Sequence, residues 1–182
     1  MSSSKPRENY LVISAIGSDR PGIVNDLAKA SAEYHCNIID SRMTVLGGEF
    51  AVIMMVAGNW DAIAKLENTL LQLADKLGLK IVIKQTQPRA LKQTISYTIN
   101  VVALDNPGIV HEIAKFFSSQ QINIDDMQTG TYCAPHTGTQ MFNLNMIINV
   151  PAGTHLPSLR EEFMLFCDDR NLDAIIEPTR NG

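Results

Sequence analysis

The chain has 182 residues, of which 45% are hydrophobic and 19% are charged, and this composition excludes a disordered or fibrous protein. Its net charge is −4, and the acidic excess is confined to residues 89–182, so the sequence shows no basic face of the kind that DNA-binding proteins carry. No apolar run approaches the roughly 20 residues that a membrane-spanning helix needs, and the polar first nine residues contain no hydrophobic signal core.

The first predicted element is a strand over residues 10–16, which leads into the sequence Asp-Arg-Pro-Gly-Ile-Val at residues 19–24. This sequence predicts a corner between a strand and a helix. Pro21 restricts its backbone to a conformation suited to the first helical turn, Asp19 complements the positive end of the helix, and Gly22 leaves space for a ligand or a neighbouring backbone. The helix packs one apolar stripe on the sheet. The stripe consists of Ile23, Leu27, Ala30 and Tyr34.

Further elements complete the first half of the chain. Its long helix has Asn59 as the expected N-cap and Gly78 as the expected stop. A pair of glycines marks a tight hairpin between two strands. In chain order, these elements are a strand from Asn37, a Gly47-Gly48 hairpin, a strand over residues 50–56, a helix over residues 60–77 and a strand over residues 79–84.

The corner sequence occurs twice. Asp-Asn-Pro-Gly-Ile-Val at residues 105–110 follows the first corner at a distance of 86 residues, and the flanking strand and helix patterns recur with it. A repeat of this length indicates a duplicated domain rather than a solenoid unit. We therefore predict a first domain over residues 1–86, a polar linker over residues 87–93 and a second domain over residues 94–182.

The second copy differs from the first in its hairpin and in its second helix. We expect the longer hairpin turn over residues 130–139 and the shorter helix from Pro157 or Ser158 to about Asp169. A strand over residues 172–177 closes the copy. The residues that we expect its two helices to bury are Ile109, Ile113, Phe116, Leu159, Phe163 and Phe166.

Each copy has the order strand, helix, strand, strand, helix, strand. This order predicts an α+β protein made of two ferredoxin-like βαββαβ domains, each with a four-stranded antiparallel sheet and two helices on one face. Sheet edges in such a fold can pair with another sheet, so the sequence leaves a homo-oligomer open.

The chain resembles the ACT domain family, whose small modules sense amino acids in metabolism. The resemblance rests on the corner sequence, on the Asn-Ile-x-Asp opening of the second strand at residues 37–40 and 123–126, and on the order of elements. Two such domains with nothing else attached, together with Pro-His-Thr-Gly-Thr in the second hairpin, further resemble the bacterial family of glycine cleavage repressors. Formyltetrahydrofolate deformylase begins with a similar ACT domain, but its catalytic domain has no counterpart here.

The ACT resemblance implies an amino-acid site beside each corner, at an interface where domains pair. Chemistry supports such a site, because N–H groups at a helix start can receive a carboxylate and Asp or Asn oxygens can receive an ammonium group. The copies differ at Arg20 and Asn106, so the two pockets need not be equivalent. The alternative is that the corners are well-formed turns without a ligand. The ligand-binding residues that the resemblance assigns are Asp19, Arg20, Gly22, Ile23, Asn37, Asp105, Asn106, Gly108, Ile109 and Asn123.

The sequence contains no motif that predicts catalysis, since it has neither a nucleophile elbow nor a phosphate-binding glycine loop of the usual kinds. Cys133, His136 and His155 do not have the spacing of a zinc site, so we expect no metal and no cofactor. Three widely spaced cysteines argue against a disulfide framework and for a reducing compartment. We therefore expect a cytoplasmic protein that has no membrane partner and is not an enzyme.

The narrower resemblance implies an amino-acid-sensing regulator that lowers transcription of glycine cleavage genes. It implies that the partner is a DNA-binding activator of the LysR type and that glycine is the effector that releases repression. The absence of a helix-turn-helix pattern and of a basic excess fits an indirect route, without direct contact to nucleic acid. The alternative is an ACT-type regulatory subunit that gives an amino-acid metabolic enzyme feedback control. A small stand-alone enzyme is a third and weaker alternative.

Overall fold

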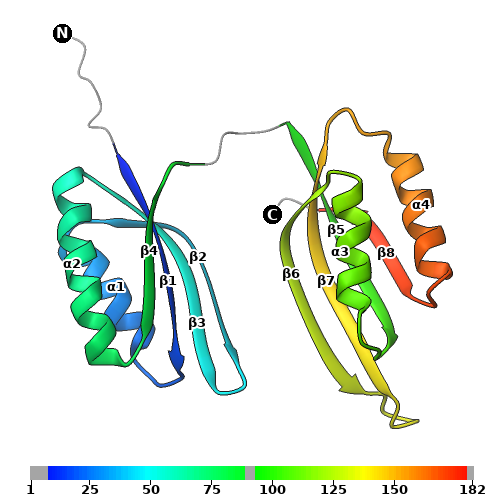
Figure 1. Ribbon diagram of the computed structural model, residues 1–182, viewed down its shortest axis with the longest axis horizontal. Helices are drawn as coiled ribbons and strands as arrows, with labels where there is room; N and C mark the ends of the chain where they lie inside the picture. The colour runs from blue at the N-terminus through cyan, green and yellow to red at the C-terminus, as the bar shows by residue number, and fades with distance from the viewer. Residues whose placement is uncertain (1–7, 89–92, 180–182) are drawn as a thin grey trace. The chain divides into compact units, whose positions relative to one another are not determined.

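The computed structural model describes residues 8–88 and 93–179, and the chain divides into two compact units, residues 1–90 and 91–182. Part of the predicted linker, residues 89–92, lies outside the described residues. Within the described residues each unit contains six elements, and Figure 1 shows their arrangement. The first unit consists of β1 (Asn9–Ser18), α1 (Ile23–Glu33), β2 (Asn37–Leu46), β3 (Glu49–Gly58), α2 (Trp60–Leu77) and β4 (Lys80–Thr86). The second consists of β5 (Thr94–Leu104), α3 (Ile109–Ser119), β6 (Asn123–Cys133), β7 (Gln140–Pro151), α4 (Leu156–Asp168) and β8 (Asp173–Pro178).

The two units have the same sheet topology. The strand order is β2-β3-β1-β4 in the first sheet and β6-β7-β5-β8 in the second, and all neighbouring strands are antiparallel. Both helices of each unit cover one face of its sheet (Figure 1). The predicted fold, a pair of ferredoxin-like βαββαβ domains of the α+β class, is confirmed.

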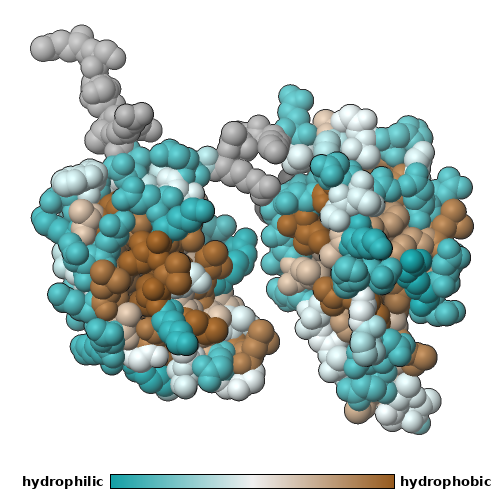
Figure 2. Space-filling view, in the orientation of Figure 1, coloured by the Kyte–Doolittle hydropathy of each residue, from teal (hydrophilic) through white to brown (hydrophobic). Residues whose placement is uncertain are grey.

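Alternation along the central strands separates a covered face from an open face. In β1, Leu11, Ile13 and Ala15 are almost completely buried beneath the helices, whereas Ser14 is exposed. The equivalent residues of β5 follow the same pattern, since Ile99 is buried and its neighbours point to the opposite face. Each unit therefore has its own hydrophobic core between sheet and helices. Hydrophobic side chains also reach the surface, as the visible face of the first unit shows in Figure 2.

Local sequence signals place the ends of several elements where they were expected. The side chain of Asn59 accepts a hydrogen bond from the Ala62 amide at 2.8 Å, and Gly78 ends α2 with a left-handed φ of 66°. In the first hairpin Gly47 and Gly48 have φ values of 60° and 84°, the two positive angles of a type I′ turn. These positions have backbone conformations that few other residues adopt without strain.

The second hairpin is shorter than predicted. Residues 130–133, which were expected in the turn, belong to β6, and the turn itself spans residues 134–139. The Ala134 amide donates to the Thr139 carbonyl at 2.8 Å, which closes the turn. Strand pairing extends the ladder further than the turn-forming residues alone suggested, because Tyr132 and Cys133 face β7 partners.

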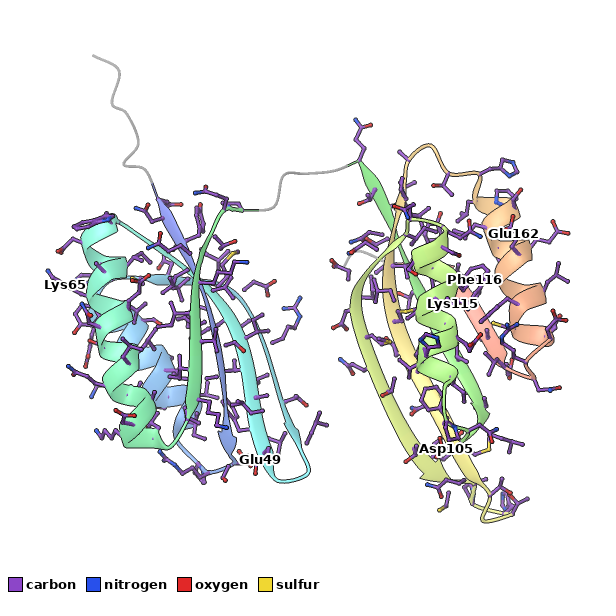
Figure 3. All side chains as sticks on the ribbon, in the orientation of Figure 1. Glu49, Lys65, Asp105, Lys115, Phe116 and Glu162 are labelled. Atoms are coloured by element: carbon purple, nitrogen blue, oxygen red, sulfur yellow. The ribbon has the colours of Figure 1, made fainter. Side chains whose placement is uncertain are left out.

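The predicted burial of Ile113, Leu159 and Phe163 is confirmed, but the last predicted residue of each stripe is wrong by one position. Phe117 and Cys167 are fully buried, whereas the predicted Phe116 and Phe166 are only partly buried. Phe116 lies between the two helices instead of beneath α3 (Figure 3). Its ring centroid lies 5.0 Å from that of Phe166 and 5.4 Å from that of Phe163. An aromatic layer thus joins α3 to α4.

Candidate functional site

The two corners have the same backbone conformation. Gly22 is the N-cap of α1 with a φ of 97°, and Gly108 is the N-cap of α3 with a φ of 99°. Both angles lie in the left-handed region that favours glycine. Pro21 and Pro107 each precede the N-cap residue, so neither proline lies in the first helical turn.

Both helices begin without a side-chain cap. A glycine has no side chain that could accept a hydrogen bond from the first amides, and no other described side chain does so. The first intrahelical bond of α3 runs from the Glu112 amide to the Gly108 carbonyl at 3.0 Å. A Cβ atom added at Gly22 or Gly108 would meet nothing within 4 Å. Among the described residues the first-turn amides therefore have no side-chain acceptor, and such amides can donate to an anionic group.

A pocket of about 390 Å³ opens beside the second corner. Three of the predicted site residues, Asn106, Gly108 and Ile109, line it. The side-chain amide of Asn106 donates to the Leu104 carbonyl at 3.4 Å, which leaves its oxygen available as an acceptor. The rest of the wall comes from the end of β5, the first turn of α3 and the turn between α4 and β8. These residues are Ala103, Leu104, Pro107, Glu112, Arg170, Asn171 and Leu172.

Arg170 and Glu112 place opposite charges on this pocket. The Arg170 Nη2 lies 3.4 Å from the Glu112 Oε2, and each side chain is 40% exposed. The guanidinium carbon of Arg170 also lies 4.1 Å from the centroid of the Phe166 ring, and its Nη1 donates to the Phe166 carbonyl at 3.4 Å. The guanidinium group is thus held in place while part of it faces solvent.

Neither residue of this pair was among the predicted site residues. Glu112 lies four residues after Gly108, where the first helical turn brings it back to the corner. Arg170 lies far along the chain, in the turn after α4. A difference between the two copies could have identified Arg170. When Leu79 is aligned with Leu172, the residue two positions earlier is Leu77 in the first copy and Arg170 in the second.

The other predicted residues of the second copy do not line the pocket. Asp105 lies where β5 ends, close to the start of α3 (Figure 3), and its amide donates to the Gln140 carbonyl at 3.0 Å. Asn123 begins β6 and pairs with Asn149 of β7. Asn149 in turn pairs with Ser96, near the beginning of β5. Since the corner follows the end of β5, the structure does not bring Asn123 to the corner within this unit.

The first corner differs in its surroundings. Asp19 and Arg20 are exposed, Ile23 is 1% exposed, and the Asp19 amide donates to the Gly48 carbonyl at 3.0 Å. Asn37 pairs with Ala57, at the far end of the sheet from the corner, as its counterpart Asn123 does. The turn after α2 packs closely here, because a Cβ atom on Gly17 would lie 2.9 Å from the Gly78 carbonyl oxygen. The first corner therefore has Leu77 at the position where the second corner has Arg170, and it has no counterpart of that arginine.

The Asn-Ile-x-Asp sequence has a structural explanation of its own. The strand register shifts between Ile38 and Asp40 in β2 and between Ile124 and Asp126 in β6. The variable residue of the motif is the extra residue of a β-bulge in each copy. This sequence sets strand geometry and does not supply a ligand at the corner within its own unit.

Residues 8–88 and 93–179 contain no cluster of three or more His, Cys, Asp or Glu side chains that could hold a metal ion. Burial raises the pKa of the Cys167 thiol to about 12 and also raises the pKa of Cys36. These two thiols are therefore protonated at neutral pH. None of the helices within the described residues is both long enough and apolar enough to cross a membrane.

Comparisons with known proteins agree with this architecture. Residues 9–84 match the family model for the ACT domain. The chain is 32% identical over 170 residues to the glycine cleavage system transcriptional repressor of Escherichia coli (strain K12), an alignment that covers 93% of this chain and 90% of the relative.

Two solved structures resemble the chain over nearly its full length. The crystal structure of a candidate glycine cleavage system transcriptional repressor has a TM-score of 0.72 at 28% identity and covers 96% of this chain and 99% of its own. A protein of unknown function from Galdieria sulphuraria has a TM-score of 0.77 at 25% identity, with 95% and 99% covered. With its duplicated ACT fold and this sequence similarity, the chain belongs to the family of the glycine cleavage system transcriptional repressor.

Proposed function

We propose that the protein is an amino-acid-responsive regulator of transcription whose effector binds in the pocket at the second corner. The observation that carries this proposal is the meeting of uncapped α3 amides with the Arg170–Glu112 pair around one cavity. An α-amino acid carries both charges on groups that are bonded to the same carbon atom. Its carboxylate can accept from Arg170 and the first amides of α3, and its ammonium group can donate to Glu112 and the Asn106 oxygen.

Glycine is the effector that we propose, because the E. coli relative is named as a repressor of the glycine cleavage system. The chemistry of the pocket fits the head group that all amino acids share. Its volume of about 390 Å³ also admits larger side chains. Because the pocket admits larger side chains, the experiment compares glycine with all the other common amino acids.

We further propose that the protein lowers expression of glycine cleavage genes through a DNA-binding activator of the LysR type, in the cytoplasm. The net charge of −4 supports an indirect route, since neutralising DNA phosphates requires a basic surface. Glycine would bind better to the arrangement of the protein that does not hold the activator. This difference in affinity shifts the population and releases repression.

A thermal-shift panel over the twenty amino acids tests the effector, because a ligand that binds only the folded state raises the melting temperature. We expect glycine to raise it in a concentration-dependent way. The partner is tested by mobility-shift experiments with a LysR-type activator on its operator. We expect the protein to alter the activator–DNA complex and glycine to reverse the effect.

Two results would contradict the proposal. A protein that retards operator DNA sequence-specifically by itself at physiological salt would exclude the indirect route. A pull-down that recovers an amino-acid metabolic enzyme instead of a transcription factor would favour the alternative function of a regulatory subunit.

A further inference from the structure

Strands β4 and β8 form matching edges of the two sheets. β4 pairs only with β1, and β8 pairs only with β5, so each has one side without a strand neighbour within the described residues (Figure 1). The sequence of β4 from Lys80 to Lys84 is Lys-Ile-Val-Ile-Lys, and that of β8 from Asp173 to Glu177 is Asp-Ala-Ile-Ile-Glu. An unpaired edge of this length is a template for another strand.

The charges of these two edges are opposite at equivalent positions. Lys80 and Lys84 lie on the open face of the first sheet with Val82 between them, and Val82 is 68% exposed. Asp173 and Glu177 lie on the open face of the second sheet with Ile175 between them, and Ile175 is 53% exposed. None of the four charged side chains takes part in an ion pair with another described residue.

We propose that two copies of this chain pair reciprocally, with β4 of each copy antiparallel to β8 of the other, so that the assembly closes as a dimer. In one register, every residue of the two five-residue segments lies opposite a residue of opposite charge or another apolar residue. It opposes Lys80 to Glu177 and Lys84 to Asp173, with Val82 opposite Ile175 on the same face. On the other face it opposes the apolar pairs Ile81–Ile176 and Ile83–Ala174, which leaves the helices of both sheets on one side.

The same charges disfavour the other pairings of these edges. Antiparallel β4 with β4 would place Lys80 opposite Lys84, and antiparallel β8 with β8 would place Asp173 opposite Glu177. Like charges directly opposite each other destabilise a strand pair. Lysines on an edge strand commonly prevent unwanted strand pairing. The acidic residues of β8 carry the opposite charge, so β8 can pair with such an edge.

The length of the chain between the sheets favours a second copy as the partner. In the proposed register Lys80 is level with Thr98, so Thr86 and Thr94 would be separated by about ten residues along the strand direction, roughly 33 Å. The eight peptide steps from Thr86 to Thr94 span at most about 29 Å. Within one chain, therefore, the two strands cannot form this ladder while β4 and β5 keep their full lengths.

Charge reversal tests the proposal. We expect sedimentation equilibrium of the wild-type chain to show a species of twice the chain mass of 20.1 kDa, weakened by added salt. The double variant Lys80→Glu, Lys84→Glu and the double variant Asp173→Lys, Glu177→Lys should each be monomeric, because both edges of each variant then carry the same charge. A mixture of the two variants should regain the doubled mass, since every β4 edge again meets an oppositely charged β8 edge.

The matched control is Lys76→Glu, Lys115→Glu, which makes the same change in charge at exposed helix positions and should leave self-association unchanged. Circular dichroism confirms that each variant is folded. A wild-type chain that is monomeric at about 100 μM would overturn the proposal. Double variants that keep the doubled mass, or a mixture that stays monomeric, would overturn it as well.

Discussion

The Arg170 guanidinium lies 3.4 Å from the Glu112 carboxylate, and the two side chains line the same pocket from different elements, one from the turn after α4 and the other from the first turn of α3. Both remain 40% exposed, so the pair contributes only about 0–1 kcal/mol to stability. A pair that stabilises the fold so little can be changed without unfolding the protein. This makes its role in ligand binding testable.

Replacing Arg170 by glutamine should weaken glycine binding at least about tenfold, because a charge-assisted hydrogen bond to the carboxylate is lost. Glu112→Gln should also weaken glycine binding, because it removes the carboxylate charge that faces the ammonium group of the ligand. Isothermal titration calorimetry measures both effects. The control is Arg20→Gln, which removes an exposed arginine at the first corner and should leave the affinity unchanged. Equal affinity of wild type and Arg170→Gln would remove this arginine from the site.

The two corner glycines give a matched pair of substitutions. Val at Gly108 or at Gly22 would adopt a left-handed conformation, which costs about 1–3 kcal/mol in either unit. We expect both variants to fold with lowered melting temperatures, and only Gly108→Val to lose glycine binding. Thermal denaturation and calorimetry on the same samples separate the two effects. Binding that survives in Gly108→Val would show that the second corner is not used.

The three cysteines should differ in reactivity. Cys133 is exposed, whereas Cys36 and Cys167 are buried with raised pKa values. Iodoacetamide at pH 8 should therefore modify one thiol per native chain and three after denaturation, as mass spectrometry would show. If Cys167 were modified as fast as Cys133 in the native protein, its thiol would be accessible to the reagent, which would contradict the prediction.

The raised pKa of Cys167 also predicts a dependence of stability on pH. The ordinary thiol pKa is 9.0 and that of the folded protein is about 12. Between these values the folded state retains a proton that the unfolded state has lost. Cys167 therefore makes its full contribution to the free energy of unfolding below pH 9, and this contribution declines as the pH rises toward 12. Urea denaturation of wild type and Cys167→Ala across this range should show a steeper decline for the wild type.

The aromatic residues of α3 test the corrected buried stripe. Phe117 is fully buried, so Phe117→Ala should cost about 3–5 kcal/mol, whereas the partly buried Phe116 should cost less when changed to alanine. Urea denaturation measures the two changes in unfolding free energy. A larger loss for Phe116→Ala would restore the stripe predicted from helical spacing alone.

The fold was readable from the sequence because the signals were local and occurred twice. Asn59 and Gly78 delimit α2 by capping chemistry, and Gly47-Gly48 tolerates the two positive φ angles that a tight turn requires. The extent of the second hairpin was missed because pairing of residues 130–133 depends on β7, which local signals do not include. Phe116 and Phe117 are adjacent and equally apolar, so only packing against α4 decides which one enters the core.

The candidate site was only partly readable from the sequence. Gly108 could be identified from its motif, since the motif fixes a local backbone conformation. Arg170 could not, because it reaches the corner through the packing of α4 and β8. Asn123 was grouped with the corner by resemblance to a family that binds ligands between domains, and in this unit it lies at the far end of the sheet.

The most direct test of the account is a titration of the ¹⁵N-labelled protein with glycine, followed by NMR of the backbone amides. The account predicts saturable shifts of the amides of Ile109, Val110 and His111, together with the side-chain resonances of Arg170, and the loss of these shifts in Arg170→Gln. Saturable binding that leaves these amides unmoved, or no binding at millimolar glycine, would contradict it.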